Sequence, residues 1–457
     1  MKTNHAILIV AAIVFAGLET TVARTAEENW PQFLGPGSRA IGANANLPDR
    51  WSATENVAWK REIPGRGWSS PIVWGDRVFL TTVVEEGKKA APPQKGFFMA
   101  GPLSADAKYQ WKILCLDLSS GNILWERTVH EGTPFRPTHA KNSFASETPT
   151  TDGERVYAYF GNVGVFCFDL KGQPVWQQKI DPHRMRFDWG TAASPILYGE
   201  RLYILNDNEG ESCLLALNKL TGEKVWRVER DEKSNWSTPF VWKNEKRTEI
   251  VTPGTDKTRS YDLDGKLLWW FKGMSHITVA TPYADGGLVY VTSGFSRDKE
   301  RPAYAIRPGG TGDISPPSGE SSNSAIAWSK PTGAPYIPTT LVYQGRFYVL
   351  YDTGTMSAFN SQTGAALFER QKLAGGSHFT SSPWANNGRV FCLDEDGVTF
   401  VVRAGDKFEM LRKNALGDDD GCLASPAMVG DRLLIRTVSR IYCIRKNAAQ
   451  ESKPAGG

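Results

Sequence analysis

One carboxylate occupies a position that is small or apolar elsewhere along the chain. Glu147 directly precedes Thr148-Pro149, one copy of a small residue–Pro pair that recurs through the sequence. At the other copies the preceding residue is Ser, Ala or Ile. If this position faces a central channel, Glu147 is a candidate anchor for a ligand, a cation or a water network. The alternative is a hydrated side chain in a water-filled channel.

Aromatic side chains stand one position earlier in three copies of the same pair. These residues are Trp68, Trp236 and Tyr336. Together they would form an aromatic platform at the channel mouth, on which a planar ligand could stack. The alternative is packing between neighbouring repeats, and the phase of the strand decides between the two.

Two loops between repeats carry cationic and aromatic side chains. One loop, residues 130–142, holds His139 and Lys141, and the next connection holds His183 and Trp189. Loops on a rigid scaffold are common binding sites. We expect these two loops to form a polar, partly basic mouth that suits an anionic or peptide ligand. The histidine spacing matches no metal-ligand pattern, so no metal site is predicted.

No constellation of residues predicts catalysis, and we expect no catalytic residues. Three acidic stretches, residues 206–209, 394–397 and 418–421, fall where hairpin turns are expected. Asp and Asn favour turns through local hydrogen bonds, so we interpret these stretches as solvated turns rather than cation ligands. The six cysteines include no Cys-x-x-Cys pair, and three of them occupy equivalent repeat positions too far apart for a disulfide. We expect buried, mostly unpaired thiols.

A repeat with intervals of mostly 43 to 46 residues must position these groups. Each copy runs from a small residue–Pro pair through a Gly hairpin turn and a third strand. Five copies end in Gly-x-x-x-aromatic, as in Gly222 and Trp226. Trp328 is expected to take this place in the fifth copy, and the seventh copy is degenerate around Phe408 and Met410. Four short strands per copy predict one propeller blade. The pairs are Ser70-Pro71, Thr148-Pro149, Ser194-Pro195, Thr238-Pro239, Thr281-Pro282, Pro338-Thr339 in altered order, Ser382-Pro383 and Ser425-Pro426.

The copies count to eight, and the last one lacks its fourth strand. Residues 57–62 look like that missing strand, so we expect them to pair with residues 439–446 and close the ring. The predicted fold is therefore all-β, an eight-bladed β-propeller of four-stranded antiparallel blades closed by an N-terminal strand. The outer-strand Trp is expected to pack between blades. The insertions at about 82–110 and 296–327 are expected to be loops outside the sheets.

The N-terminus has the pattern of a signal peptide over residues 1–23. Lys2 precedes an uncharged stretch, residues 6–18, and Thr21-Val22-Ala23 supplies small residues for cleavage. The alternative is a retained anchor. We expect an exported bacterial protein, periplasmic or secreted, with no stable membrane insertion after cleavage.

The remaining chain divides into three predicted parts. These are an N-terminal extension at 24–55, the propeller at 56–446 and a disordered tail at 447–457. The net charge of +4 and the absence of long Lys/Arg runs argue against a nucleic-acid partner. We expect a monomer.

The Gly-x-x-x-Trp ending, after a strand that ends in Asp or Asn, resembles the tryptophan-docking repeat of quinoprotein alcohol dehydrogenases. It is also similar to the repeat of the outer-membrane assembly propeller lipoprotein of Gram-negative bacteria. Residues 29–36, 65–71 and 261–269 resemble exported PQQ-binding-like β-propeller repeat proteins. The resemblance covers roughly residues 29–446, and it implies a fold more than a function.

The resemblance implies a cofactor only if the dehydrogenase site is retained. Those enzymes use pyrroloquinoline quinone (PQQ) and Ca²⁺, with a disulfide between adjacent cysteines over the quinone. The chain has neither a Cys-Cys pair nor a Cys-x-x-Cys-His haem motif. We therefore expect no cofactor and a non-catalytic scaffold for an envelope protein or peptide. Two alternatives stay open: a PQQ- and Ca²⁺-dependent dehydrogenase with a divergent site, and a propeller that binds a small molecule or glycan through its channel aromatics.

Overall fold

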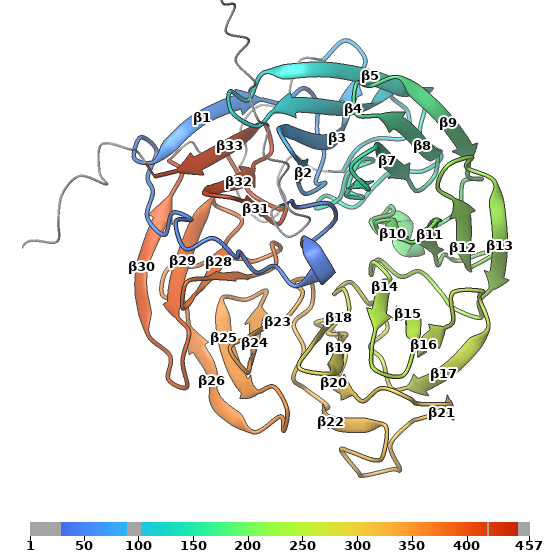
Figure 1. Cartoon of the computed structure of the whole chain (residues 1–457), viewed down its shortest axis with the longest axis vertical. Helices are drawn as coiled ribbons and strands as arrows, with labels where there is room; N and C mark the ends of the chain where they lie inside the picture. Colours follow the sequence, from blue (N-terminus) through green and yellow to red (C-terminus); the bar gives the residue numbers. More distant parts are fainter. Residues whose placement is uncertain (1–28, 89–101, 418–419, 447–457) are drawn as a thin grey trace, which may run out of the picture.

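The computed structural model describes residues 29–88, 102–417 and 420–446. The predicted signal peptide and C-terminal tail lie outside these ranges. The described chain forms eight sheets around a central axis, which confirms the all-β, eight-bladed propeller (Figure 1). Two short 3-10 helices, η2 (Pro36–Ser38) and η3 (Arg186–Asp188), lie in connections. No helix within the described ranges is long and apolar enough to cross a membrane.

The blades are numbered 1 to 8 from β2–β5 onward, and each has the same strand order from the axis outward. The innermost strands are β2 (Ile72–Trp74), β6 (Thr150–Thr151), β10 (Ile196–Tyr198), β14 (Phe240–Lys243), β18 (Tyr283–Asp285), β23 (Leu341–Tyr343), β27 (Trp384–Asn386) and β31 (Ala427–Val429). The second strands are β3 (Arg77–Glu85), β7 (Arg155–Phe160), β11 (Arg201–Asn206), β15 (Thr248–Thr252), β19 (Leu288–Thr292), β24 (Arg346–Tyr351), β28 (Arg389–Leu393) and β32 (Arg432–Arg436).

Two further strands complete each blade. The third strands are β4 (Tyr109–Asp117), β8 (Gly164–Asp169), β12 (Cys213–Asn218), β16 (Lys257–Tyr261), β20 (Ala303–Ile306), β25 (Thr355–Asn360), β29 (Val398–Arg403) and β33 (Arg440–Arg445). The outer strands are β5 (Ile123–Gly132), β9 (Pro174–Lys179), β13 (Lys224–Glu229), β17 (Leu267–Lys272), β22 (Ile326–Lys330), β26 (Ala366–Lys372), β30 (Met410–Ala415) and β1 (Val57–Glu62).

Short glycine turns join the first two strands of most blades. Gly75 has φ of +56° in the two-residue connection between β2 and β3, a backbone conformation that side-chain-bearing residues rarely adopt. The second and third strands are buried almost throughout, whereas β9 and β13 alternate between exposed and half-buried residues. The apolar layers between neighbouring blades therefore form the core.

The outer-strand tryptophans pack between blades, as predicted. Trp125 lies against Gly172 of the next blade, and its indole Nε1–H donates to the carbonyl of Leu170 (3.1 Å). The equivalent pairs are Trp59 with Gly121, Trp176 with Gly222, Trp226 with Gly265, and Trp328 with Gly364. Trp269 departs from this pattern, because its indole N–H donates to Glu249 of its own blade (2.7 Å).

The ring closes through the N-terminal strand, which confirms the predicted latch. Strand β1 pairs antiparallel with β33, with Trp59 opposite Cys443 and Glu62 opposite Arg440. The last blade therefore takes its outer strand from the opposite end of the chain (Figure 1).

The N-terminal extension lies against the axial ends of several blades. Trp30 bridges to Val73 of blade 1, and the carbonyl of Pro31 accepts the amide of Thr151 in blade 2. Farther along, the amide of Gly42 donates to Ala385 in blade 7. These contacts are at the inner strands, where the extension closes one end of the axis.

Both insertions contribute residues to the sheets, so the prediction of loops outside the sheets is wrong in part. Residues 82–85 and 109–110 belong to β3 and β4 of blade 1. The insertion at 296–327 supplies β20, the third strand of blade 5. Residues 312–313 form β21 (Gly312–Asp313), which pairs in parallel with the outer strand β17 of blade 4. Part of the other insertion, residues 89–101, lies outside the described residues. All six cysteines are buried, and none forms a disulfide within the described residues, as expected.

Candidate functional site

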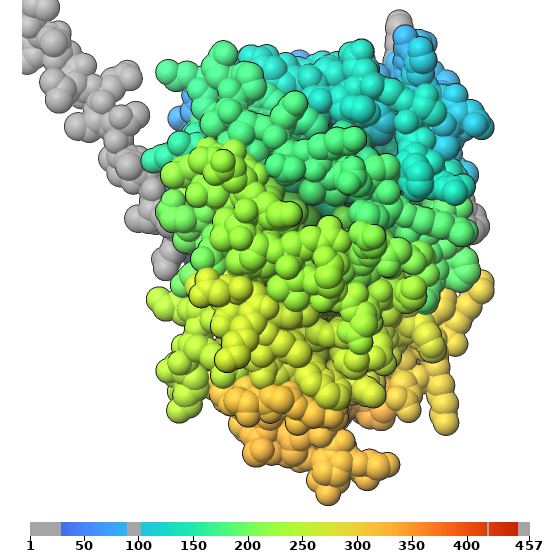
Figure 2. Space-filling view, turned by 90° about the vertical axis from the view of Figure 1, so that its right-hand side faces the viewer, coloured from blue at the N-terminus to red at the C-terminus, as the bar shows by residue number. Residues whose placement is uncertain are grey.

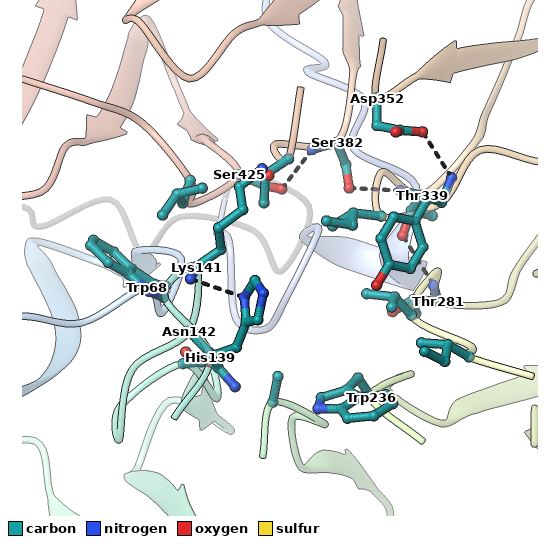
Figure 3. Close-up of a pocket in the computed structure, with 18 of the residues that line it drawn as sticks. Trp68, His139, Lys141, Asn142, Trp236, Thr281, Thr339, Asp352, Ser382 and Ser425 are labelled. Atoms are coloured by element: carbon teal, nitrogen blue, oxygen red, sulfur yellow. Dashed lines mark hydrogen bonds between the residues drawn. The ribbon is translucent and has the colours of Figure 1, made fainter. Parts of the chain in front are cut away.

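A cavity of about 530 Å³ lies on the axis, and we call it the axial cup. Phe33 of the N-terminal extension reaches it from one end. At the other end the lining includes loop residues such as Phe187, which is 67% exposed, and Arg297. Figure 3 shows side chains from many blades converging on this space.

A ring of hydroxyls, one from each blade, lines the cup. In six of the eight steps around the ring, a hydroxyl oxygen accepts the backbone N–H of the equivalent residue in the preceding blade. The N–H of Ser382, for example, donates to Oγ of Ser425 (3.0 Å; Figure 3). No such bond links Thr238 to Thr281 or Ser425 to Ser70, and the hydroxyls of Thr281 and Ser70 have no partner in the described chain. The ring is Ser70, Thr148, Ser194, Thr238, Thr281, Thr339, Ser382 and Ser425.

A second ring lines the cup two residues before each hydroxyl. It consists of Trp68, Ser146, Ala192, Trp236, Val279, Ile337, Thr380 and Leu423. In an extended segment successive side chains point to opposite sides, so the residue between the two rings turns away from the axis at most blades. In blade 6 the hydroxyl belongs to Thr339, which makes Ile337 the equivalent of Trp68. Tyr336 also lines the cup, one position earlier.

Glu147 is therefore not a channel residue, and both expectations for its surroundings are wrong. Its neighbours Ser146 and Thr148 line the cup, while Glu147 itself is 1% exposed and points between blades. Oε1 accepts the N–H of Gly161 (3.1 Å), and Oε2 has no hydrogen-bond partner in the described chain. Burial raises the pKa of the Glu147 carboxyl to about 7.

The predicted aromatic residues do converge on the cup. Trp68, Trp236 and Tyr336 all line it, joined by Trp189. The rings of Trp189 and Trp236 lie 5.8 Å apart, and the Trp236 indole N–H donates to the carbonyl of Gly190 (2.7 Å). The indole ring of Trp236 is therefore available to a ligand in the cup, whereas its N–H group is already bonded to Gly190. The alternative, that these three aromatic side chains only pack between neighbouring repeats, does not explain why they line the cup.

The loop before blade 2 crosses toward blade 7 at the cup. The ammonium group of Lys141 lies 2.6 Å from Oε1 of Glu395, with the two side chains 11% and 2% exposed. Thr380, another cup residue, donates its hydroxyl to the same oxygen (2.6 Å). His139 lines the cup beside Trp189, and burial, reinforced by the charge of Lys141, lowers the pKa of its imidazole.

The two loops expected to form one polar mouth bring only some of their predicted residues to the cup. His139, Lys141 and Trp189 line the cup, but His183 lies in a separate small pocket with His130 and Pro134. The connection that carries His183 therefore contributes Trp189 to the axis and places its histidine elsewhere.

The acidic stretches are not solvated turns, which corrects the expectation for them. Asp207 is buried and pairs with the equally buried Arg230, with Oδ1 2.7 Å from Nε. Asp394 and Glu395 are each 1% exposed, and Asp420 accepts hydrogen bonds from Thr437 and Ser439. Residues 418–419 lie outside the described chain. Each stretch buries a carboxylate that is bonded to protein groups.

Several cup residues went unnoticed in the sequence. The hydroxyl ring was within the motif itself, because every copy of the small residue–Pro pair carries Ser or Thr, never Ala or Gly. The Ser and Thr residues of these pairs were classed together as small, and the hydroxyl group that all of them carry was not considered. Phe33 comes from the N-terminal extension, whereas Phe295 and Asp352 lie in the connections between the second and third strands of blades 5 and 6. Their residue types differ, so the repeat gives no shared signal for them.

The donors around the cup do not fit a Ca²⁺-bound quinone. Ca²⁺ needs six or more oxygen ligands, yet Asp352 is the one carboxylate among the described residues lining the cup. The amide of Asn142 is engaged by the carbonyl of Trp189 and by Ser146. No group of three or more Asp, Glu, His or Cys side chains in the described ranges is arranged to hold a metal ion.

Comparison with known proteins gives one family match. A family model described as outer membrane protein assembly factor BamB matches residues 50–209 and 210–309. The outer membrane protein assembly factor BamB of Yersinia pestis is 22% identical over 343 residues, which cover 72% of this chain and 78% of that protein.

Two solved structures share the fold at low sequence identity. The quinohemoprotein alcohol dehydrogenase of Comamonas testosteroni aligns with a TM-score of 0.58 at 12% identity, over 94% of this chain and 82% of that one. The computationally designed Ika8 protein aligns with a TM-score of 0.54 at 10% identity, over 89% of this chain and 99% of that one. These similarities establish the propeller architecture.

Proposed function

Because the chain belongs to the family described as outer membrane protein assembly factor BamB, we propose that it is a non-catalytic protein-binding scaffold of the bacterial cell envelope. On this proposal the chain is exported, and its partner is a protein or peptide segment. The name of the Yersinia pestis relative, an assembly factor, supports a role in bringing other proteins together. The partner binds at the rim of the ring as an added β-strand.

The strand β21 is the observation that carries this proposal. The outer edge of blade 4 takes up a short extended segment in parallel, pairing Trp269 with Gly312 and Trp270 with Asp313. Two further bonds extend the contact: Ile314 N–H to the carbonyl of Trp270 (2.9 Å), and Lys272 N–H to Oγ of Ser315 (3.1 Å). An outer propeller strand in this chain therefore accepts an additional strand, which is how β-augmentation works.

The rim of blades 1–4 also exposes apolar side chains. Leu124, Val175, Val225 and Leu267, on β5, β9, β13 and β17, are 45–51% exposed. Among the described residues, no outer strand of blades 5–8 carries a large hydrophobic side chain this exposed. Figure 2 views the ring from the side on which these outer strands lie. In the described chain β5, β9 and β13 have no further strand on their outer edge, whereas β21 already pairs with β17. Blades 1–3 therefore supply both parts of a strand-binding site, an unpaired edge and apolar side chains beside it.

Site-specific photo-crosslinking in the native envelope tests the proposal. A crosslinker at Val225 on β13 is expected to capture a discrete protein through one extended segment. The matched control is Ala366 on the outer strand of blade 6, where capture of the same protein is not expected. Val175→Lys should reduce capture at Val225 without changing folding, because it places a charge on β9, the outer strand of the adjoining blade, within the same exposed apolar rim. Equal capture at both positions, or none, overturns the proposal.

A further inference from the structure

The hydroxyl ring of the axial cup holds donors that the protein leaves unused. Six of the eight hydroxyls accept a backbone N–H, yet none donates its own hydrogen to an acceptor within the described chain. Tyr336 adds a phenol hydroxyl to the lining of the same space. Buried hydroxyls normally find acceptors, so an occupant of the cup is expected to present several oxygens.

Aromatic faces line different sides of the cup. Trp189 and Trp236 form one group, with ring centroids 5.8 Å apart. Phe295 and Tyr336 form a second group from other connections, with centroids 5.4 Å apart, and Trp68 comes from blade 1. Such faces suit flat C–H surfaces and add little to the binding of water or an inorganic ion.

The charges around the cup balance. The charge of Lys141 is neutralised by its ion pair with Glu395. The described lining also contains Arg297 and Asp352, whose opposite charges cancel in the sum. Two histidines, His139 and His378, also line the cup, and burial lowers the pKa of the His139 imidazole, which favours its neutral form. A site with no surplus positive charge favours an uncharged ligand over a polycarboxylate such as PQQ, whose desolvation would not be compensated.

We propose that the axial cup binds a neutral mono- or disaccharide. Sugar rings present C–H faces to aromatic side chains and hydroxyl oxygens to donors around their edge. The cup volume of about 530 Å³ lies within the usual range for small-ligand sites. This site is on the axis, so it is independent of the rim assigned to protein partners.

Isothermal titration of the purified protein with glucose, N-acetylglucosamine, maltose and cellobiose tests the proposal. At least one is expected to bind saturably, with glucuronate and PQQ binding more weakly. Trp236→Ala should weaken binding by about tenfold or more through the lost aromatic face. Tyr336→Phe removes only one hydroxyl and should weaken binding by about three- to tenfold.

Trp270→Ala on the outer strand β17 is the matched control, and saccharide affinity should not change. Near-ultraviolet circular dichroism checks that each variant is folded, and Tyr336→Phe keeps the test decisive if Trp236→Ala unfolds. Absence of saturable binding by all four neutral saccharides overturns the proposal. So does tighter binding of PQQ or glucuronate, or equal loss of affinity in Trp270→Ala and Tyr336→Phe.

Discussion

The indole ring of Trp59 covers Gly121 so closely that a Cβ at that glycine would fall 2.5 Å from Cε3 of the ring. Trp59 lies on the N-terminal strand that completes blade 8, and Gly121 lies in blade 1. The indole N–H also donates to the carbonyl of Leu118 (3.0 Å). This contact packs blade 8 against blade 1, where the propeller ring closes.

Gly121→Ala should destabilise the protein more than Gly75→Ala. Both glycines have positive φ, +70° and +56°, so both substitutions cost about 1–2 kcal/mol in backbone strain. A Cβ at Gly75 meets nothing within 4 Å, whereas one at Gly121 displaces Trp59 and adds about 1–3 kcal/mol. Urea-unfolding midpoints measure the difference. Equal losses would mean that Trp59 does not support closure.

Thr148→Val should destabilise the hydroxyl ring by about 1–3 kcal/mol, because it leaves the buried N–H of Ser70 without its acceptor. The distance from that nitrogen to Oγ1 of Thr148 is 2.9 Å. Thr281→Val is the matched control, since the Thr281 hydroxyl has no partner in the described chain and its loss should cost nothing. Thermal denaturation of the two variants measures the contrast, and similar melting temperatures would contradict it.

Glu147 should make stability depend on pH. Burial raises the pKa of its carboxyl from 4.5 to about 7, so the folded protein holds this proton more tightly than the unfolded chain. Unfolding then releases a proton between these two values, and stability falls as pH rises through that window, by at most about 3 kcal/mol. Glu147→Gln should remove this contribution. Urea midpoints at pH 5 and pH 8 measure it, and an unchanged pH dependence in the variant would refute the assignment.

Lys141→Met should destabilise the protein by about 3–5 kcal/mol, because it leaves the buried carboxylate of Glu395 without its ion-pair partner. The pair is largely shielded from solvent, with side chains 11% and 2% exposed. The double variant Lys141→Met/Glu395→Gln removes both charges and should recover much of the loss. Denaturation of the wild type, both single variants and the double variant gives the coupling energy. Additive losses would show that the two charges act independently.

The repeat could be predicted because its signals are local. The small residue–Pro pair, the glycine turn and the Gly-x-x-x-aromatic ending each span only a few residues, so most blades keep recognisable copies of them in the sequence. Ring closure by residues 57–62 followed from the same pattern, because the last copy lacked the strand that the N-terminus supplies.

The cup could be predicted only in part. Trp68, Trp236, Lys141 and His139 meet at the axis as the sequence suggested, whereas His183 does not. Loop residues carry no periodicity, so their direction depends on the neighbouring loops against which they pack.

The sequence by itself determined the blade count, the strand order and the tryptophan contacts between blades except that of Trp269, since these features repeat at short range. Only the tertiary structure decided which side of each inner segment faces the axis. That phase is set by a bond between blades: the Thr148 hydroxyl accepts the amide of Ser70, 78 residues away in the chain. The same bond orients the Thr148 side chain toward the cup, so the side chain of Glu147, the preceding residue, points into the layer between blades. A contact between residues so distant leaves no local pattern, so the orientation of Glu147 could not be deduced from its neighbours in sequence.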